Sequence, residues 1–197
     1  MELVCEFENL RWYKFEKICY TSSISSSSIK EPNTSIRTIN GNHLEGKSDK
    51  DVEVIRFRDT TVNYFPQGLN KIFPNLKAVL IHYCELKSIT RKNLDGLENI
   101  QILRCDSNKI TTLPDDLFRN MKKLIDISFR NNDLGCLSSK VFKPILNNGL
   151  KFVDFSGNRS IDAYYSDSTY TTYICRNKVD PVAQLMAMID EECNKPV

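Results

Sequence analysis

A repeat of about 24 residues constrains the fold of this chain more than any other feature of its sequence. Between Ile100 and Lys123 the sequence reads IQILRCDSNKITTLPDDLFRNMKK, with apolar residues at positions 100, 103, 105, 110, 113, 117 and 121. The same spacing begins at Leu76, Leu124 and Leu150, and a weaker copy begins at Val52. Five units in one phase indicate a solenoid, because a single unit cannot bury its own apolar strand face and must stack on its neighbours.

One polar position follows each expected strand and carries the family signature. Positions 60, 84, 108, 132 and 158 hold Thr, Cys, Asn, Asn and Asn. An Asn there can hydrogen-bond the backbone of its own turn and of the adjoining turn, so we predict a ladder that is firmest toward the C-terminus. The pattern resembles the 24-residue class of leucine-rich-repeat proteins, known from extracellular receptors and secreted proteins, over about residues 52–161. The resemblance implies an α/β-type solenoid arc with a parallel β-sheet on its concave face.

Residues 1–51 are expected to form an N-terminal β cap that shields the open end of the solenoid core. Cys5-Glu6-Phe7, Trp12 and Ile18-Cys19-Tyr20 predict two strands joined by a Cys5–Cys19 disulfide, followed by a loop at Ser22–Ser28 and another strand near residues 36–39. This arrangement resembles the N-terminal cap of small secreted insect leucine-rich-repeat proteins.

Residues 162–197 are expected to form the C-terminal cap, with a helix near residues 180–193. Asp180-Pro181 is a typical helix start, and the apolar residues that follow fall on one helical face: Val182, Leu185, Met186, Ile189 and Cys193. We interpret this face as a lid on the core. In related secreted proteins the terminal cap is often bridged, so the resemblance implies a Cys175–Cys193 disulfide.

The cysteines and the first residues leave the cellular compartment open. Seven cysteines is an odd count, so at least one thiol is free or pairs between chains if the others form bridges. Cys84 on the ladder and Cys105 at an inward strand position are interpreted as buried thiols, and Cys136 at a variable turn position is the candidate for a reactive or intermolecular thiol. Met1–Cys5 shows no secretory signal. The alternatives are a secreted protein whose leader is absent from this sequence and a cytoplasmic scaffold with reduced thiols.

Composition gives no support to nucleic-acid or membrane binding. The 27 basic and 25 acidic residues give a net charge of +2, which produces no strong field toward polyanions. The longest candidate apolar run, near Ala78–Ile81, has the length of a buried strand rather than the ~20 residues that span a bilayer. We therefore expect no nucleic-acid partner and no membrane insertion.

One motif suggests an enzyme and is rejected on its context. Gly41–Ser48 fits the G-x-x-x-x-G-K-[ST] pattern of a phosphate-binding loop, which works between a strand and a long helix. Here it is followed by Asp49-Lys50-Asp51 and the β-rich segment 52–57, which leaves no room for that helix. The two histidines, His43 and His82, are isolated in sequence. We predict no catalytic residues, no metal site and no cofactor.

Two sequons for asparagine glycosylation occur, in different contexts. Asn33 lies in a polar loop of the N-terminal cap and is a candidate for modification if the chain is secreted. Asn158 is a ladder residue whose side chain is expected to turn inward, so we expect it to stay unmodified.

The outward strand positions predict a protein-binding surface on the concave face. Arginine, tyrosine, phenylalanine and aliphatic residues are enriched in protein interfaces, and the charges here are mixed. We expect the arginines to project into solvent, so that Arg104→Glu leaves stability almost unchanged. The alternative is a solvated face with scattered charges. Likeness to secreted insect proteins adds a role in recognition or innate defence as an analogy at the level of the fold. The candidate contact residues are Arg56, Arg58, Leu80, His82, Tyr83, Arg104, Asp106, Asp126, Arg130, Phe152 and Asp154.

Overall fold

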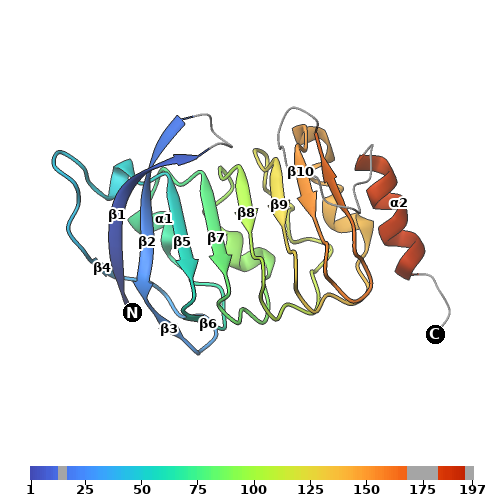
Figure 1. Ribbon diagram of the computed structural model, residues 1–197, viewed down its shortest axis with the longest axis horizontal. Coiled ribbons are helices and arrows are strands. Elements are labelled where there is room, and N and C mark those ends of the chain that lie inside the picture. Colours follow the sequence, from blue (N-terminus) through green and yellow to red (C-terminus); the bar gives the residue numbers. More distant parts are fainter. Residues whose placement is uncertain (13–16, 168–181, 194–197) are drawn as a thin grey trace.

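The computed structural model describes residues 1–12, 17–167 and 182–193, with the strands side by side from the N-terminal to the C-terminal end (Figure 1). In these residues one nine-stranded sheet has the order β11-β10-β9-β8-β7-β5-β2-β1-β4. Its strands are β1 (Glu2–Trp12), β2 (Lys17–Ser26), β4 (Thr38–Asn40), β5 (Val54–Arg58), β7 (Ala78–His82), β8 (Ile102–Arg104), β9 (Asp126–Ser128), β10 (Phe152–Asp154) and β11 (Tyr164–Ser166). A second, two-stranded sheet pairs β3 (Ser28–Ile29) with β6 (Thr61–Val62).

Each repeat contributes one short strand, and the five repeat strands β5, β7, β8, β9 and β10 are parallel. The return segments behind the sheet are short turns and helices: α1 (Leu69–Ile72) and 3-10 helices at Asp49–Asp51, Arg91–Leu94, Ser139–Phe142 and Leu146–Asn148. Equivalent residues of successive repeats lie opposite each other, as in Ile55↔Val79 and Leu103↔Ile127. The 24-residue period in the sequence is therefore one circuit of the solenoid.

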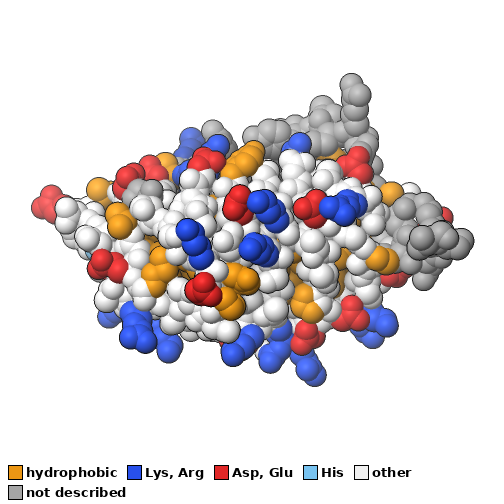
Figure 2. Space-filling view, turned by 90° about the horizontal axis from the view of Figure 1, so that it is seen from below, with side chains coloured by type: hydrophobic (Ala, Val, Ile, Leu, Met, Phe, Trp, Pro, Cys, Tyr) orange, Lys and Arg blue, Asp and Glu red, His pale blue; other side chains and the backbone are white. Residues whose placement is uncertain are grey.

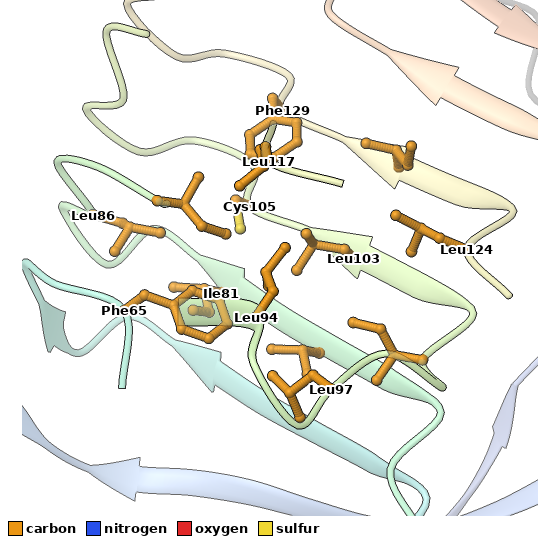
Figure 3. Close-up of a cluster of buried hydrophobic side chains, with 14 of the residues drawn as sticks. Phe65, Ile81, Leu86, Leu94, Leu97, Leu103, Cys105, Leu117, Leu124 and Phe129 are labelled. Carbon is orange, nitrogen blue, oxygen red and sulfur yellow. The ribbon is translucent and has the colours of Figure 1, made fainter. Parts of the chain in front are cut away.

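The apolar positions of the repeat form one continuous core between the sheet and the return segments. Figure 3 shows this packing across successive repeats, where strand residues such as Ile81 and Leu103 pack with Leu94 and Leu117 from the return segments. Phe129 is fully buried and stacks on Phe155, with ring centroids 6.1 Å apart. Stacking therefore buries in each repeat the face that the repeat could not bury alone.

The predicted asparagine ladder is present. Asn108 Oδ1 accepts hydrogen bonds from the backbone N–H groups of Cys84 and Leu86, at 3.1 and 3.0 Å, while its Nδ2 donates to the carbonyl of Ile81 at 2.7 Å. Asn132 makes the equivalent contacts one repeat later. At the weaker N-terminal end, Thr60 is hydrogen-bonded to Ser27 instead. The ladder thus satisfies buried backbone groups that the sharp turn removes from the sheet.

The residue before each ladder position has a left-handed backbone. Asp59, Tyr83, Ser107 and Asn131 have φ values of 52°, 56°, 56° and 51°, and Gly157 occupies the same place in the last repeat with φ of 73°. A bulky residue such as Tyr83 is unfavourable in this conformation, so the turn is imposed by the stacked repeats rather than by local preference.

The N-terminal cap has the two expected strands, but the predicted Cys5–Cys19 disulfide is wrong. Neither cysteine forms a disulfide. In the antiparallel register Cys5 lies opposite Ile24 and Cys19 lies opposite Leu10, so the two cysteines are several residues apart along the hairpin. They also face opposite sides of the sheet, since Cys5 belongs to the main core and Cys19 to a separate apolar cluster.

The serine-rich segment predicted as a loop is largely strand. Residues 22–26 continue β2, which pairs with β1 on one side and β5 on the other. Ser22 is fully buried and Ile24 is 4% exposed, whereas Ser23 donates to Glu8. Hydrogen bonding to two neighbouring strands therefore overrides the weak strand preference of serine.

The C-terminal end carries helix α2 (Val182–Cys193), in agreement with the predicted helical segment. Leu185, Met186 and Ile189 are buried in the core, and Asp190 accepts a hydrogen bond from the backbone N–H of Ser139 at 2.9 Å. Asp180-Pro181 and the Cys175–Cys193 bridge lie outside the described residues or side chains. Within the described parts, no helix is long and apolar enough to cross a membrane.

The interpretation of Cys136 as a reactive or intermolecular thiol is wrong, because Cys136 is disulfide-bonded. Four buried cysteines of the described regions, Cys5, Cys19, Cys84 and Cys105, form no disulfide, and burial raises the pKa of the Cys84 and Cys105 thiols. The interpretation of Cys84 and Cys105 as buried thiols agrees with the structure.

Candidate binding surface on the concave face

The concave face is the side of the sheet that points away from the main core. Asp106 and Arg130 lie two residues beyond the ends of β8 and β9. The other predicted residues on this face lie on strands β5, β7, β8, β9 and β10: Arg56, Arg58, Leu80, His82, Arg104, Asp126, Phe152 and Asp154. Tyr83 lies in the turn after β7 and not on the strand, where 55% of its area is exposed. The fold therefore brings all but one of the predicted residues to one face.

An apolar stripe that the repeat pattern did not identify as buried runs along this face. Cys19, Val54, Ala78, Leu80 and Ile102 form an apolar cluster that is separate from the main core. Each is no more than 4% exposed. Leu80 was predicted as a contact residue, but its side chain is already covered in the folded chain. It supports the charged side chains around it and leaves little area for a partner.

Arg104 is held in a fixed position, contrary to the expectation that it projects freely into solvent. Its Nε and Nη2 atoms donate to the two carboxylate oxygens of Asp126, at 2.8 and 2.7 Å. Its guanidinium also lies over the ring of Phe152, 4.7 Å from the ring centre. Asp126 is fully buried. The repeat pattern predicts that Arg104 points away from the core, but it gives no signal for the bidentate hydrogen bonds to Asp126 on the next strand.

Two further carboxylates on the concave face are poorly solvated. Burial raises the pKa of Asp106, whose Oδ1 accepts from the backbone N–H of Arg130 at 3.2 Å. Burial also raises the pKa of Asp154, which accepts hydrogen bonds from the backbone and hydroxyl of Ser156 at 2.8 and 2.6 Å. The protein's own donors thus already occupy one oxygen, Oδ1, of each carboxylate.

His82 lies beside Asp106 and among arginines. Burial, together with the charges of Arg104, Arg58 and Arg56, lowers the pKa of His82 to about 4. Its Nε2 is buried without a hydrogen-bond partner among the described residues, and the nearest carboxylate oxygen, on Asp106, is 3.7 Å away. His82 is therefore a neutral side chain at physiological pH.

We expect His82 to make the protein less stable in mild acid. Because its pKa in the folded chain lies below the unfolded value of 6.5, the folded chain binds fewer protons in this range. Its contribution is present above pH 6.5 and is lost as pH falls toward 4, by up to roughly 3 kcal/mol. Urea unfolding of the wild type and His82→Gln between pH 7 and 4 measures it. A difference between the two proteins that does not change with pH would refute the assignment; the opposing effects of Asp106 and Asp154 occur in both.

The remaining polar side chains stand at the rim of the concave face. Arg56 lies 3.9 Å from Glu8, while Arg58 lies beside Asp59 and over the ring of Tyr83, 5.8 Å from the ring centre. Arg130 is exposed. The turns that follow these strands are seen end-on in Figure 2, where acidic and basic side chains are interspersed across the centre of the view. The rim is thus a set of mixed charges.

The segment that fits the phosphate-binding pattern has a different structure. Ser48 begins a three-residue 3-10 helix at Asp49–Asp51, and β5 follows soon after, so the required long helix is absent here. Lys47 lies near Asp51 and over the ring of Tyr20, and does not point into a loop of backbone N–H groups.

His43 has neighbours that sequence analysis did not find. Its Nδ1 lies 3.0 Å from the hydroxyl of Tyr20, its Nε2 lies 2.8 Å from Asp49, and its ring packs on Phe7. These contacts hold the loop against the cap. No group of side chains suited to a metal ion occurs in the parts of the chain that the structure describes.

Similarity to solved structures identifies the fold. The chain superposes on Toll in the Drosophila Toll–Spatzle complex with a TM-score of 0.52 and 21% identity, covering 68% of this chain and 18% of that chain. A glycosylated form of that complex gives a TM-score of 0.51. TLR13 in its complex with ssRNA13 gives 0.50 and 23% identity, covering 62% of this chain and 18% of that chain. The chain has the leucine-rich-repeat fold.

The similarity to these receptors is one of architecture, and it extends over only a fraction of each receptor chain. The chain spans less than a fifth of the length of the receptor chains it matches. No protein-family model matches the sequence, and no curated protein is significantly similar to it. At these identities the likeness establishes the fold, and function has to be argued from the surface itself.

Proposed function

We propose that this leucine-rich-repeat chain is a protein-binding module, not an enzyme, whose concave face binds a protein ligand. The observation that carries the proposal is the rigid arrangement of mixed charges around the buried apolar stripe. Arg56, His82 and Arg130 stand on or just beyond strands fixed by parallel pairing on both sides. Side chains that are positioned before binding reduce the ordering cost of an interface.

A protein ligand fits this face better than a nucleic acid does. The concave arginines are accompanied by Asp106, Asp126 and Asp154, so the face lacks the one-signed field that backbone phosphates require. Among the structural neighbours, Toll is in complex with Spatzle and TLR13 with a single-stranded RNA. RNA binding is thus the second candidate function, and the experiment below separates the two.

The proposed setting is extracellular, with a role in recognition or innate defence like that of secreted insect relatives of this fold. Cys136 supports it, because structural disulfides persist in oxidising compartments. Asn33 of the sequon is exposed, with its Oδ1 accepting from Gln67 Nε2 at 3.1 Å, and is the proposed glycosylation site. The side-chain amide of Asn158, in the other sequon, donates hydrogen bonds to the carbonyls of Phe129 and Phe155. The four buried cysteines that form no disulfide support the alternative, a cytoplasmic scaffold.

The test is capture with cross-linking from extracellular fluid and, separately, from lysate, followed by affinity measurements on the captured protein. Arg56→Glu and Arg130→Glu should each weaken binding by on the order of 2 kcal/mol if these residues are anchors. Arg130→Glu should keep the wild-type thermal midpoint, because Arg130 is exposed and exposed substitutions change stability by about 0.5 kcal/mol or less. Arg56 is half-buried beside Glu8, so the affinity of Arg56→Glu is measured at a temperature where its own unfolding curve shows it fully folded. The matched control is Lys109→Glu, the same charge change on the turn edge.

Three outcomes would contradict the proposal. Wild-type affinity in both concave variants, with loss in Lys109→Glu, would move the site to the turn edge. Tighter binding of single-stranded RNA than of any captured protein would favour the second function. A partner found only in lysate would reject the extracellular setting.

A further inference from the structure

A second candidate site lies away from the concave face, at the edge of the sheet where the parallel strands begin. A groove with a volume of about 590 Å³ runs across this edge over four successive circuits of the chain. Most of its lining residues are polar. We call it the amino-edge groove, and the residues that matter are Lys50, Asn75, Lys77, Asn99, Gln101 and Lys123.

The backbone under the groove is rigid. The N–H of Lys77 donates to the carbonyl of Glu53 at 2.7 Å, that of Gln101 to Lys77 at 2.7 Å, and that of Ile125 to Gln101 at 3.0 Å. The side chain of Asn75 donates to the carbonyl of Lys50 at 2.8 Å. These bonds form a second ladder, opposite the asparagine ladder. They hold the lining residues in a row whose steps follow the strand spacing of about 4.8 Å.

The charges in the groove favour an anion. Four lysines line it against two acids. Lys77 is paired with Glu53 at 2.5 Å, and Lys47 lies 3.8 Å from Asp51. Lys50 and Lys123 are exposed and have no acidic partner among the described residues. The groove therefore offers two uncompensated ammonium groups, one on either side of a row of amides.

The other lining groups distinguish among anionic ligands. Asn75, Asn99 and Gln101 carry amides, which both donate to and accept from sugar hydroxyls. The groove has no arginine, and the single aromatic side chain among its lining residues, Tyr20, already has Lys47 over its ring. Nucleic-acid bases need open aromatic or guanidinium faces for stacking, and none is offered here.

We propose that the amino-edge groove binds a sulfated oligosaccharide, with Lys50 and Lys123 contacting sulfate groups and the amides between them contacting hydroxyls. This inference does not depend on the proposed protein-binding function, because the groove and the concave face share none of the residues assigned to binding. A protein that binds its ligand on one face could in this way be retained on a sulfated polysaccharide through another edge.

The experiment measures binding of a size-defined heparin-derived octasaccharide to the full chain by calorimetry at low salt. The double variant Lys50→Ala/Lys123→Ala should lower affinity about tenfold, as expected for two exposed ionic contacts. The control variant Lys87→Ala/Lys109→Ala removes the same charge from the turn edge and should stay within about twofold of wild type. The chemically desulfated octasaccharide should bind the wild type at least as weakly as the sulfated one binds the groove variant.

Four results would overturn the proposal. One is an absence of octasaccharide binding by the wild type, and a second is an equal loss in both double variants, which would mean non-specific attraction. A third is equal binding of the desulfated sugar. The last is tighter binding of a single-stranded RNA of matched charge that is lost in the groove variant, which would make the groove a nucleic-acid site. Arg130→Glu should leave octasaccharide affinity unchanged, so failure of the concave-face proposal is distinguishable from failure of this one.

Discussion

Replacing Arg104 with alanine is expected to lower the free energy of unfolding by roughly 3–5 kcal/mol, although the residue lies on the side of the sheet away from the main core. Its two hydrogen bonds to Asp126, at 2.8 and 2.7 Å, hold a carboxylate that is fully buried. Without the guanidinium, that charge has to be protonated, exposed to water or left unpaired. The variant also loses the contact with the ring of Phe152.

The matched control for Arg104→Ala is Arg130→Ala, because Arg130 is exposed and makes no ion pair with the described residues. Urea unfolding should show a change of no more than about 0.5 kcal/mol for the control. The double variant Arg104→Leu/Asp126→Leu should recover much of the loss, since removing both charges leaves no unpaired group. If Arg104→Ala costs no more than Arg130→Ala, the pair contributes only what an exposed salt bridge does.

The second large effect is expected for Asn132→Leu, which keeps the size of the side chain and removes its hydrogen bonds. Asn132 Oδ1 accepts from the N–H of Ile110 at 3.0 Å, and its Nδ2 donates to the carbonyls of Cys105 and Phe129 at 2.8 and 3.0 Å. Each buried backbone group left without a partner costs about 1–3 kcal/mol. A total loss of roughly 3–5 kcal/mol follows, measurable as a lower urea midpoint.

Asn131→Gly provides the comparison for the ladder variant. Asn131 is the neighbouring asparagine, but it is exposed and has a left-handed backbone with φ of 51°, which glycine adopts without strain. We expect its stability to stay within about 1 kcal/mol of wild type. Similar losses in both variants would mean that the turn tolerates no change, and that the hydrogen bonds of Asn132 are not the cause.

The main core and the asparagine ladder could be predicted because each depends on residues one period apart. An inward residue such as Leu103 is identified by its phase alone, and Asn108 and Asn132 repeat at the same phase. The turn conformation at Tyr83 carries no comparable signal, since glycine appears at the equivalent position only at Gly157. Tyr83 was therefore predicted on the concave face together with the strand residues, although it lies in the turn after β7.

The features that were missed depend on register and on diagonal contacts between strands. Cys5 and Cys19 looked paired because they flank one hairpin, but the register places Cys19 opposite Leu10. Arg104 reaches Asp126, which lies diagonally on the next strand, since the residue directly opposite Arg104 is Ser128. The amino-edge groove went unnoticed because the residues before the strands vary from repeat to repeat and show no pattern of their own.

The contacts of Arg104 bear on how a protein of this kind can change its length. Arg104, Asp126 and Phe152 come from three consecutive repeats, and Asp126 and Phe152 occupy the same column of the sheet. A deletion of residues 124–149 would keep the phase of the solenoid but bring a phenyl ring to the place of the carboxylate. Duplication of the unit 100–123 would supply a second arginine without a second acid. Gain or loss of either unit therefore leaves an arginine on the concave face without the carboxylate that holds it.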